Sequence, residues 1–229
     1  MSASEVAYVL YLSFIFLAKG IPVTLAVTAA SISIGFALGL SMAVARVFIG
    51  FPISGLVEAY EKFFRGVPDL VIIFLIYFGL PALTGRPIAP FPAISLALGL
   101  RSAAYQSQIF RGALEAVTRD QMDAALSVGM RVHQAITHII LPQALRISLP
   151  GWASEFAVVI KDSSYAFLLG LMDLMRSAEL LRASLLAMGL IEYLIIPYAI
   201  AALIYFAFTF PISRYLASWA VRKRVELGL

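Results

Sequence analysis

Three charged side chains inside apolar stretches are the strongest candidates for chemistry in this sequence. Arg101 and Asp69 are each the only charged residue of a long apolar stretch, and Glu155 lies in a third, less clean one. Charges within a membrane are costly and usually face the protein interior or water. A guanidinium can hold a carboxylate by paired hydrogen bonds, while a carboxylate can face an ammonium. Arg101 with Glu155 or Asp69 therefore suits a small zwitterion such as an amino acid, and Tyr105 could line the same path.

Each of these side chains also has a purely structural alternative. Arg101 and Glu155 could pair only with each other, Asp69 could lie at the cytoplasmic mouth, and Tyr105 could be an ordinary packed tyrosine. The sequence leaves both possibilities open.

The composition indicates an integral membrane protein. Of the 229 residues, 62% are hydrophobic and 13% are charged, whereas soluble domains average about 25% charged residues. The chain has no cysteine, which excludes disulfides and thiolate metal sites. The formal net charge is +4, but the basic residues flank apolar stretches, so we expect them to orient the chain in membrane lipid and expect no nucleic-acid partner.

Five stretches are long and apolar enough to cross a bilayer, which takes about 20 residues of helix. They are 21–45, 66–85, 88–110, 144–171 and 193–213. Lipid offers no hydrogen bonds to a bare backbone, so such stretches indicate helices rather than barrel strands. The predicted fold is an all-α integral membrane protein, with one transmembrane domain over 1–229 and about five transmembrane helices.

Residues 6–18 have the length of a signal-peptide core, but Glu5 precedes them and no basic segment does. We expect an interfacial or partly inserted helix there.

The first predicted span carries a stripe of small residues. Ser31, Gly35, Gly39 and Ala43 recur every four residues. Such a stripe lets a second helix approach closely, so it predicts static helix packing, with a sliding surface as the alternative.

The distribution of basic residues predicts the orientation. Most of the 17 Lys and Arg residues fall after the first span, around the polar segment 118–142, or in the C-terminal tail. Cytoplasmic loops carry such an excess. We therefore expect a multi-pass cell-membrane protein with its N-terminus outside and its C-terminus in the cytoplasm.

The polar segment 118–142 predicts a short cytoplasmic helix between the third and fourth spans. Thr118 followed by Gln121 fits a capping box. Ala125 and Gly129 are four residues apart and share a face that is nearly free of side chains. Pro142 disfavours a straight continuation into the next span. Such a helix could be offered to a soluble partner, or it could be an ordinary solvated connector.

The chain shows no means of powering or catalysing a reaction itself. No Gly-Lys dipeptide occurs, so a phosphate-binding loop of the type G-x-x-x-x-G-K-[ST] is excluded. His133 and His138 are more easily explained as surface residues than as metal ligands. We expect no catalytic residue, no metal site and no cofactor on this chain.

The residues of the polar segment resemble a known family. The stretches RGALEAVTRDQMDAALSVGM and IILPQALRISLP are similar to the EAA loop of permeases of ATP-binding-cassette (ABC) importers, in the branch that takes up polar amino acids. Asp123-Ala124-Ala125 stands where that family has Glu-Ala-Ala. Three further motifs extend the resemblance over most of the chain: 64–68 (FRGVP), 78–81 (FGLP) and 161–164 (KDSS).

The sequence departs from the family pattern at two places. Ser107-Gln108 stands where Ala-Glu is usual, and Ser154 stands where Asn is expected. Both departures leave the substrate open.

The resemblance implies a transport mechanism and a set of partners. The EAA helix would dock into a cleft of a separate ABC ATPase dimer, which holds ATP and Mg²⁺ and swings paired permease chains between inward and outward states. An extracytoplasmic solute-binding protein would deliver a polar amino acid, and the second permease chain could be identical or different. The docking residues implied are Asp123, Ala124, Ala125, Val128, Gly129 and Arg131.

Three other functions remain as alternatives. The chain could be a permease for another small solute, such as methionine or an osmolyte. It could also be a secondary transporter, although no clear internal repeat supports this. The third alternative is a membrane scaffold without transport.

Overall fold

The computed structural model describes residues 3–226, which are helical almost throughout. The elements in chain order are α1 (Ala3–Phe48), α2 (Ile53–Gly66), α3 (Asp69–Phe74), η1 (Leu75–Gly79), α4 (Leu80–Thr84), α5 (Pro90–Ser127), α6 (Val132–Ala135), η2 (Ile136–Ile140), α7 (Leu141–Asp162), η3 (Ser163–Leu169), α8 (Leu174–Ala187), η4 (Ile191–Tyr193) and α9 (Ile196–Glu226). The all-α fold class is confirmed.

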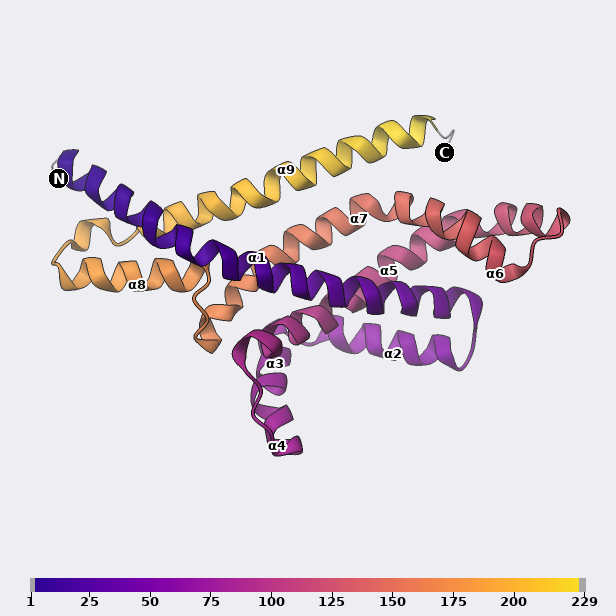
Figure 1. Cartoon of the computed structure of the whole chain (residues 1–229), viewed down its shortest axis with the longest axis horizontal. Helices are drawn as coiled ribbons and strands as arrows, with labels where there is room; N and C mark the ends of the chain where they lie inside the picture. The colour runs from indigo at the N-terminus through magenta and orange to yellow at the C-terminus, as the bar shows by residue number, and fades with distance from the viewer. Residues whose placement is uncertain (1–2, 227–229) are drawn as a thin grey trace.

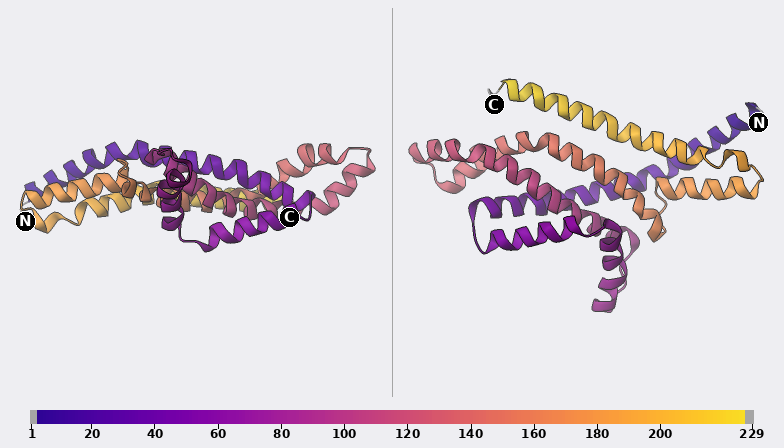
Figure 2. Two further views of the ribbon diagram at one scale, coloured as in Figure 1. Left: turned by 90° about the horizontal axis from the view of Figure 1, so that it is seen from below. Right: turned by 180° about the vertical axis from the view of Figure 1, so that it is seen from behind.

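The long helices α1, α5, α7 and α9 run roughly along the longest axis of the molecule (Figure 1). The N-terminal end of α1 lies at one end of this axis, and the turn between α5 and α6 lies at the other, as both views of Figure 2 also show. Helix α2 folds back beside the second half of α1, and α8 lies beside the first half.

Helix α1 differs from the prediction because 6–18 and 21–45 form one continuous helix of 46 residues. No separate N-terminal helix exists. The small-residue stripe of α1 packs against α5, as expected for static packing. A Cβ added at Gly35 would lie 2.4 Å from Gln106 Nε2, and one added at Gly39 would lie 3.0 Å from the carbonyl oxygen of Ala103. The two small residues therefore make room for Gln106, which is fully buried.

The second predicted span, 66–85, begins at a sharp bend of the chain. Helix α2 meets the α3–α4 segment at 105°. Val67 is extended (φ −95°, ψ 135°), because a residue that precedes a proline disfavours helical backbone, and Pro68 then begins the next helix. Among the described residues, Glu5–Phe48 and Ile191–Ile212 are long and apolar enough to span a membrane alone, and the bent pair would be a third. The exact number of five spans stays a prediction.

Two π-helical turns precede prolines within the helical segments. The turn η1 comes just before Pro81, and η2 comes just before Pro142. A proline lacks an N–H and its ring clashes with the carbonyl four residues earlier, and a wider turn relieves both problems. Helix therefore continues from α6 through η2 into α7, and Pro142 does not end it.

The expected extents of the later spans also need correction. In the fourth predicted span, 144–171, the α-helix α7 ends at Asp162 and the 3-10 helix η3 follows to Leu169. Helix α8 was not expected at all. Its first turn is capped by Asp173, whose carboxylate accepts from the backbone N–H groups of Met175 and Arg176.

Candidate functional site

A cluster of one guanidinium and three carboxylates lies where α3, α5 and α7 meet. Arg101 Nη1 lies 3.0 Å from Glu155 Oε1 and 3.5 Å from Asp162 Oδ2, and Arg101 Nε lies 3.3 Å from Asp69 Oδ1. The Arg101 and Glu155 side chains are 10% and 4% exposed. We call these four residues the Arg101 cluster, and its formal charge is two negative units when all four groups are ionised.

Local structure explains how each member reaches the cluster. Asp69 lies in the first turn of α3, immediately after the bend at Pro68. Arg101 projects from α5, a helix of 38 residues. Glu155 and Asp162 are seven residues apart on α7, which is two turns, so both lie on the same face. The structure therefore brings the candidate residues Arg101, Glu155 and Asp69 together, and their role in substrate binding stays a prediction.

Tyr105 lies beside the cluster. The Arg101 guanidinium carbon is 4.3 Å from the centre of the Tyr105 ring, and the Arg65 guanidinium carbon is 5.2 Å from it. Both arginines are within range of a cation–π interaction. Arg65 and Lys161, the other basic residues near this cluster, are exposed.

Sequence reasoning missed Asp162 and Arg65 as members of this site. A signal existed for Asp162, because its spacing of seven from Glu155 predicts a shared helix face. No comparable signal existed for Arg65, since its approach to Tyr105 depends on how α2 folds back. Arg101 does pair with Glu155, but the alternative in which these two residues pair only with each other is wrong, because Asp69 and Asp162 also lie within ion-pair distance of the guanidinium. The guanidinium is therefore already occupied by carboxylates of its own chain.

The predicted docking residues lie in the last turn of α5 and in the turn that follows it. Helix α5 continues past Thr118 to Ser127, so no helix begins at Thr118 and the predicted capping box is wrong; the side chains of 118–120 lie outside the described part of the chain. The next helix, α6, begins instead at Val132, and the backbone N–H of its N-cap residue Arg131 donates to Gln134 Oε1 at 2.9 Å. We call 123–135 the docking hairpin.

The turn of the docking hairpin is a Schellman motif. Gly129 has a φ of 83°. Its N–H donates to the carbonyl of Leu126, and the Met130 N–H donates to that of Ala125. These two bonds satisfy carbonyls at the end of α5, and glycine adopts the left-handed backbone without the cost of a Cβ. Gly129 therefore serves the turn itself.

Exposure divides the predicted docking residues into two groups. Ala125 is only 2% exposed, so the expected open surface at Ala125 is wrong. The others lie on the surface, and Val128 is 78% exposed. The exposed members are Asp123, Ala124, Val128, Gly129 and Arg131.

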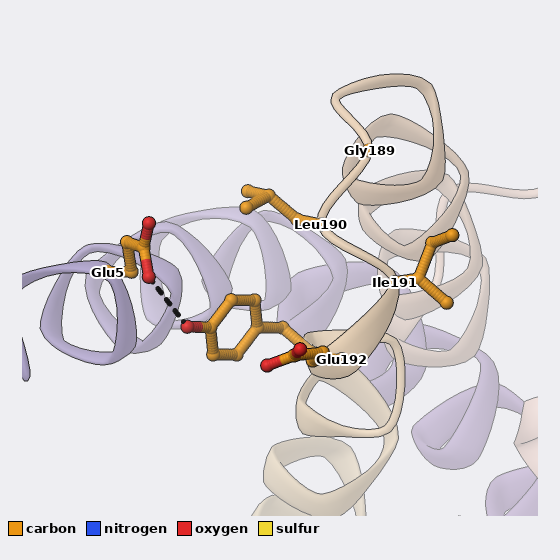
Figure 3. A pocket seen from close by; sticks show the side chains of 6 residues that line it. Glu5, Gly189, Leu190, Ile191 and Glu192 are labelled. Atoms are coloured by element: carbon orange, nitrogen blue, oxygen red, sulfur yellow. Dashed lines mark hydrogen bonds between the residues drawn. The ribbon is translucent and has the colours of Figure 1, made fainter. Parts of the chain in front are cut away.

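A pocket of about 360 Å³ lies at the opposite end of the molecule from the docking hairpin. The Tyr193 hydroxyl donates to Glu5 Oε2 at 3.0 Å. Figure 3 shows Glu5 on the first helix, facing the turn that carries Leu190. Glu192 also lines the pocket. The bond from Tyr193 fastens the first turn of α1 to the C-terminal third of the chain.

Comparison with known proteins identifies the family. The model of the binding-protein-dependent transport system inner membrane component matches residues 35–223. The chain belongs to this family. Its members are membrane-embedded permease subunits of transporters rather than enzymes, and the permease resemblance seen in the sequence is confirmed.

Individual relatives and a solved structure agree with this assignment. The probable glutamine ABC transporter permease protein GlnM of Bacillus subtilis (strain 168) is 35% identical over 83% of this chain and 85% of its own length. The arginine transport system permease protein ArtQ of the same organism is 33% identical, over 79% and 86%. The crystal structure of an amino acid ABC transporter with histidines superposes with a TM-score of 0.78 at 33% identity, covering 97% of this chain and 100% of that one.

Proposed function

We propose that this chain is the permease subunit of an ABC importer that carries polar amino acids across the cell membrane. The observation that carries the proposal is the continuity of α5. This one helix bears Arg101 within the buried cluster and Asp123 in the exposed docking hairpin. The two residues are 22 positions apart, which corresponds to about 33 Å at about 1.5 Å per residue. A motion imposed at the hairpin would therefore reach the cluster through a single rigid element.

The docking hairpin is proposed to fit a separate ABC ATPase dimer, which binds ATP and Mg²⁺. Its exposed carboxylate, Asp123, and the apolar Val128 offer a charged and a hydrophobic contact. We adopt the orientation expected from the basic residues. The docking hairpin and the C-terminus then face the cytoplasm, and the N-terminus and the pocket at Tyr193 lie outside. An extracytoplasmic solute-binding protein would approach that outer end. A second permease chain would complete the path.

The Arg101 cluster is proposed to hold the amino end of the substrate. Three carboxylates surround one guanidinium, so an ammonium finds acceptors there, whereas a substrate carboxylate would have to displace one that Arg101 already holds. Arg65, which is exposed and lies beside Tyr105, is therefore a better candidate than Arg101 for binding the substrate carboxylate. The surplus of negative charge favours amino acids with cationic side chains over those with anionic ones.

Reconstitution tests this function. The permease, its ATPase and its binding protein are placed in proteoliposomes, and uptake of a panel of labelled amino acids is measured. We expect uptake only when ATP is present on the ATPase side and the binding protein is present on the other side. Uptake that persists without ATP and follows an ion gradient would instead identify a secondary transporter.

A further inference from the structure

A second buried charged group lies between the Arg101 cluster and the docking hairpin. Glu61 of α2 is 1% exposed, although most of its neighbours on this helix are exposed. Its carboxylate forms a salt bridge with Arg46 from the last turn of α1. It also accepts a hydrogen bond from Ser107 Oγ at 2.7 Å and one from Gln108 Nε2 at 3.2 Å. Three helices therefore meet on one carboxylate.

The two donors from α5 are both uncharged, which suits a buried carboxylate. A glutamate at position 108 would set a second carboxylate against Glu61 Oε2, where glutamine donates a hydrogen bond. An alanine at position 107 would remove the short bond from the hydroxyl. Ser107 and Gln108 therefore both act as hydrogen-bond donors to the buried carboxylate of Glu61.

The position of Glu61 links the two functional regions. One turn further along α2, Arg65 lies against Tyr105, and the α3 segment after the bend brings Asp69 to Arg101. Ser107 and Gln108 lie on α5 between Arg101 and the docking hairpin. A displacement of α5 would therefore be passed to α2 through Glu61, and from α2 to Arg65 and Asp69.

We propose that Glu61 is the positioning residue that couples movement of α5 to α2 during transport, and that Arg46, Ser107 and Gln108 are its matched partners. This inference rests on the proposed importer function. Its direct consequence is that neutralising Glu61 uncouples ATP hydrolysis from uptake while leaving delivery of substrate by the binding protein intact.

An exchange of the two side chains tests the proposal in the reconstituted complex. Glu61→Gln removes the buried carboxylate that pairs with Arg46, and Gln108→Glu sets two carboxylates against each other. The double variant restores one carboxylate and one amide. Glu58→Gln is the matched control, because Glu58 contacts the same arginine at 3.3 Å but is 44% exposed.

The measured quantities are uptake per ATP hydrolysed, the apparent affinity for the loaded binding protein, and the thermal midpoint of each purified variant. We expect each single variant to lower uptake per ATP about tenfold, since groups in contact are strongly coupled. The apparent affinity should stay unchanged, the double variant should recover at least half of the parent ratio, and Glu58→Gln should resemble the parent.

Two results would overturn the inference. A Glu61→Gln variant with the same uptake per ATP as the parent would refute the coupling role and leave the importer function intact. A double variant with a restored thermal midpoint, but with uptake per ATP no better than either single variant, would do the same. If the parent itself showed no ATP-dependent uptake, the importer function would be refuted and the coupling role with it. In that case, a double variant that recovers the thermal midpoint of the parent would show that the Glu61 contacts serve stability alone.

Discussion

Replacing Arg101 by glutamine should destabilise the protein strongly, because the change removes a cation that lies within ion-pair distance of three carboxylates. Glu155 is 4% exposed, and Arg101 Nη1 lies 3.0 Å from it. Removing one partner of a buried ion pair costs about 3–5 kcal/mol, since the other charge stays buried without compensation. For a chain of this length, that loss corresponds to a fall in the thermal midpoint of about 6–20 °C.

The assay is the thermal midpoint of purified protein in one detergent at neutral pH, measured together with uptake. Arg65→Gln is the control, because this exposed arginine contacts the Tyr105 ring and should cost less than about 1 kcal/mol. The double variant Arg101→Gln with Glu155→Gln removes opposite charges together, so it should recover part of the midpoint without recovering uptake. An Arg101→Gln variant as stable as the parent would refute the assignment of a buried, charge-compensated cluster.

Three further outcomes follow from the structure. Gly20→Ala should lower the thermal midpoint, by overpacking that costs about 1–3 kcal/mol, because a Cβ there would lie 2.4 Å from the backbone oxygen of Asp173; an unchanged midpoint would contradict this close approach of α1 and α8. Gly129→Ala forces alanine into a left-handed backbone, which costs about 1–2 kcal/mol. This change should loosen the docking hairpin and lower the stimulation of the ATPase. Gly66→Ala, where an added Cβ would meet open space, should leave both unchanged. In competition assays with the reconstituted complex, lysine should inhibit uptake about tenfold more effectively than glutamate, and equal inhibition would argue against a role for the surplus negative charge.

Apolar length predicted the helical membrane fold, but it did not predict how the helices are divided. The apolar stretches 6–18 and 21–45 were predicted as separate helices because Lys19 lies between them. A single lysine does not end a helix, and α1 continues through it. The bend before Asp69 could have been anticipated from Pro68. Helix α8 escaped notice because a helix of 14 residues with several polar side chains has no spanning-length signature.

The candidate site was predictable where charge and apolar surroundings coincide on one helix. Arg101 and Glu155 were found in this way. Glu61 was missed because α2 is amphipathic and its polar residues resembled a loop between spans. Its spacing of four from Val57, the other buried residue of α2, was the available signal. Which helix covers that face depends on tertiary packing, and local sequence does not encode it.

Crosslinking from the docking hairpin tests the central claim most directly. The chain has no cysteine, so a single Val128→Cys variant carries one thiol at a site that is 78% exposed. In native membranes, a short crosslinker should join it to a polypeptide that binds ATP, while Phe14→Cys, at an exposed site in the N-terminal half of α1, should not form this product. Failure of Val128→Cys to reach any ATP-binding polypeptide, in membranes that still take up substrate, would contradict the account.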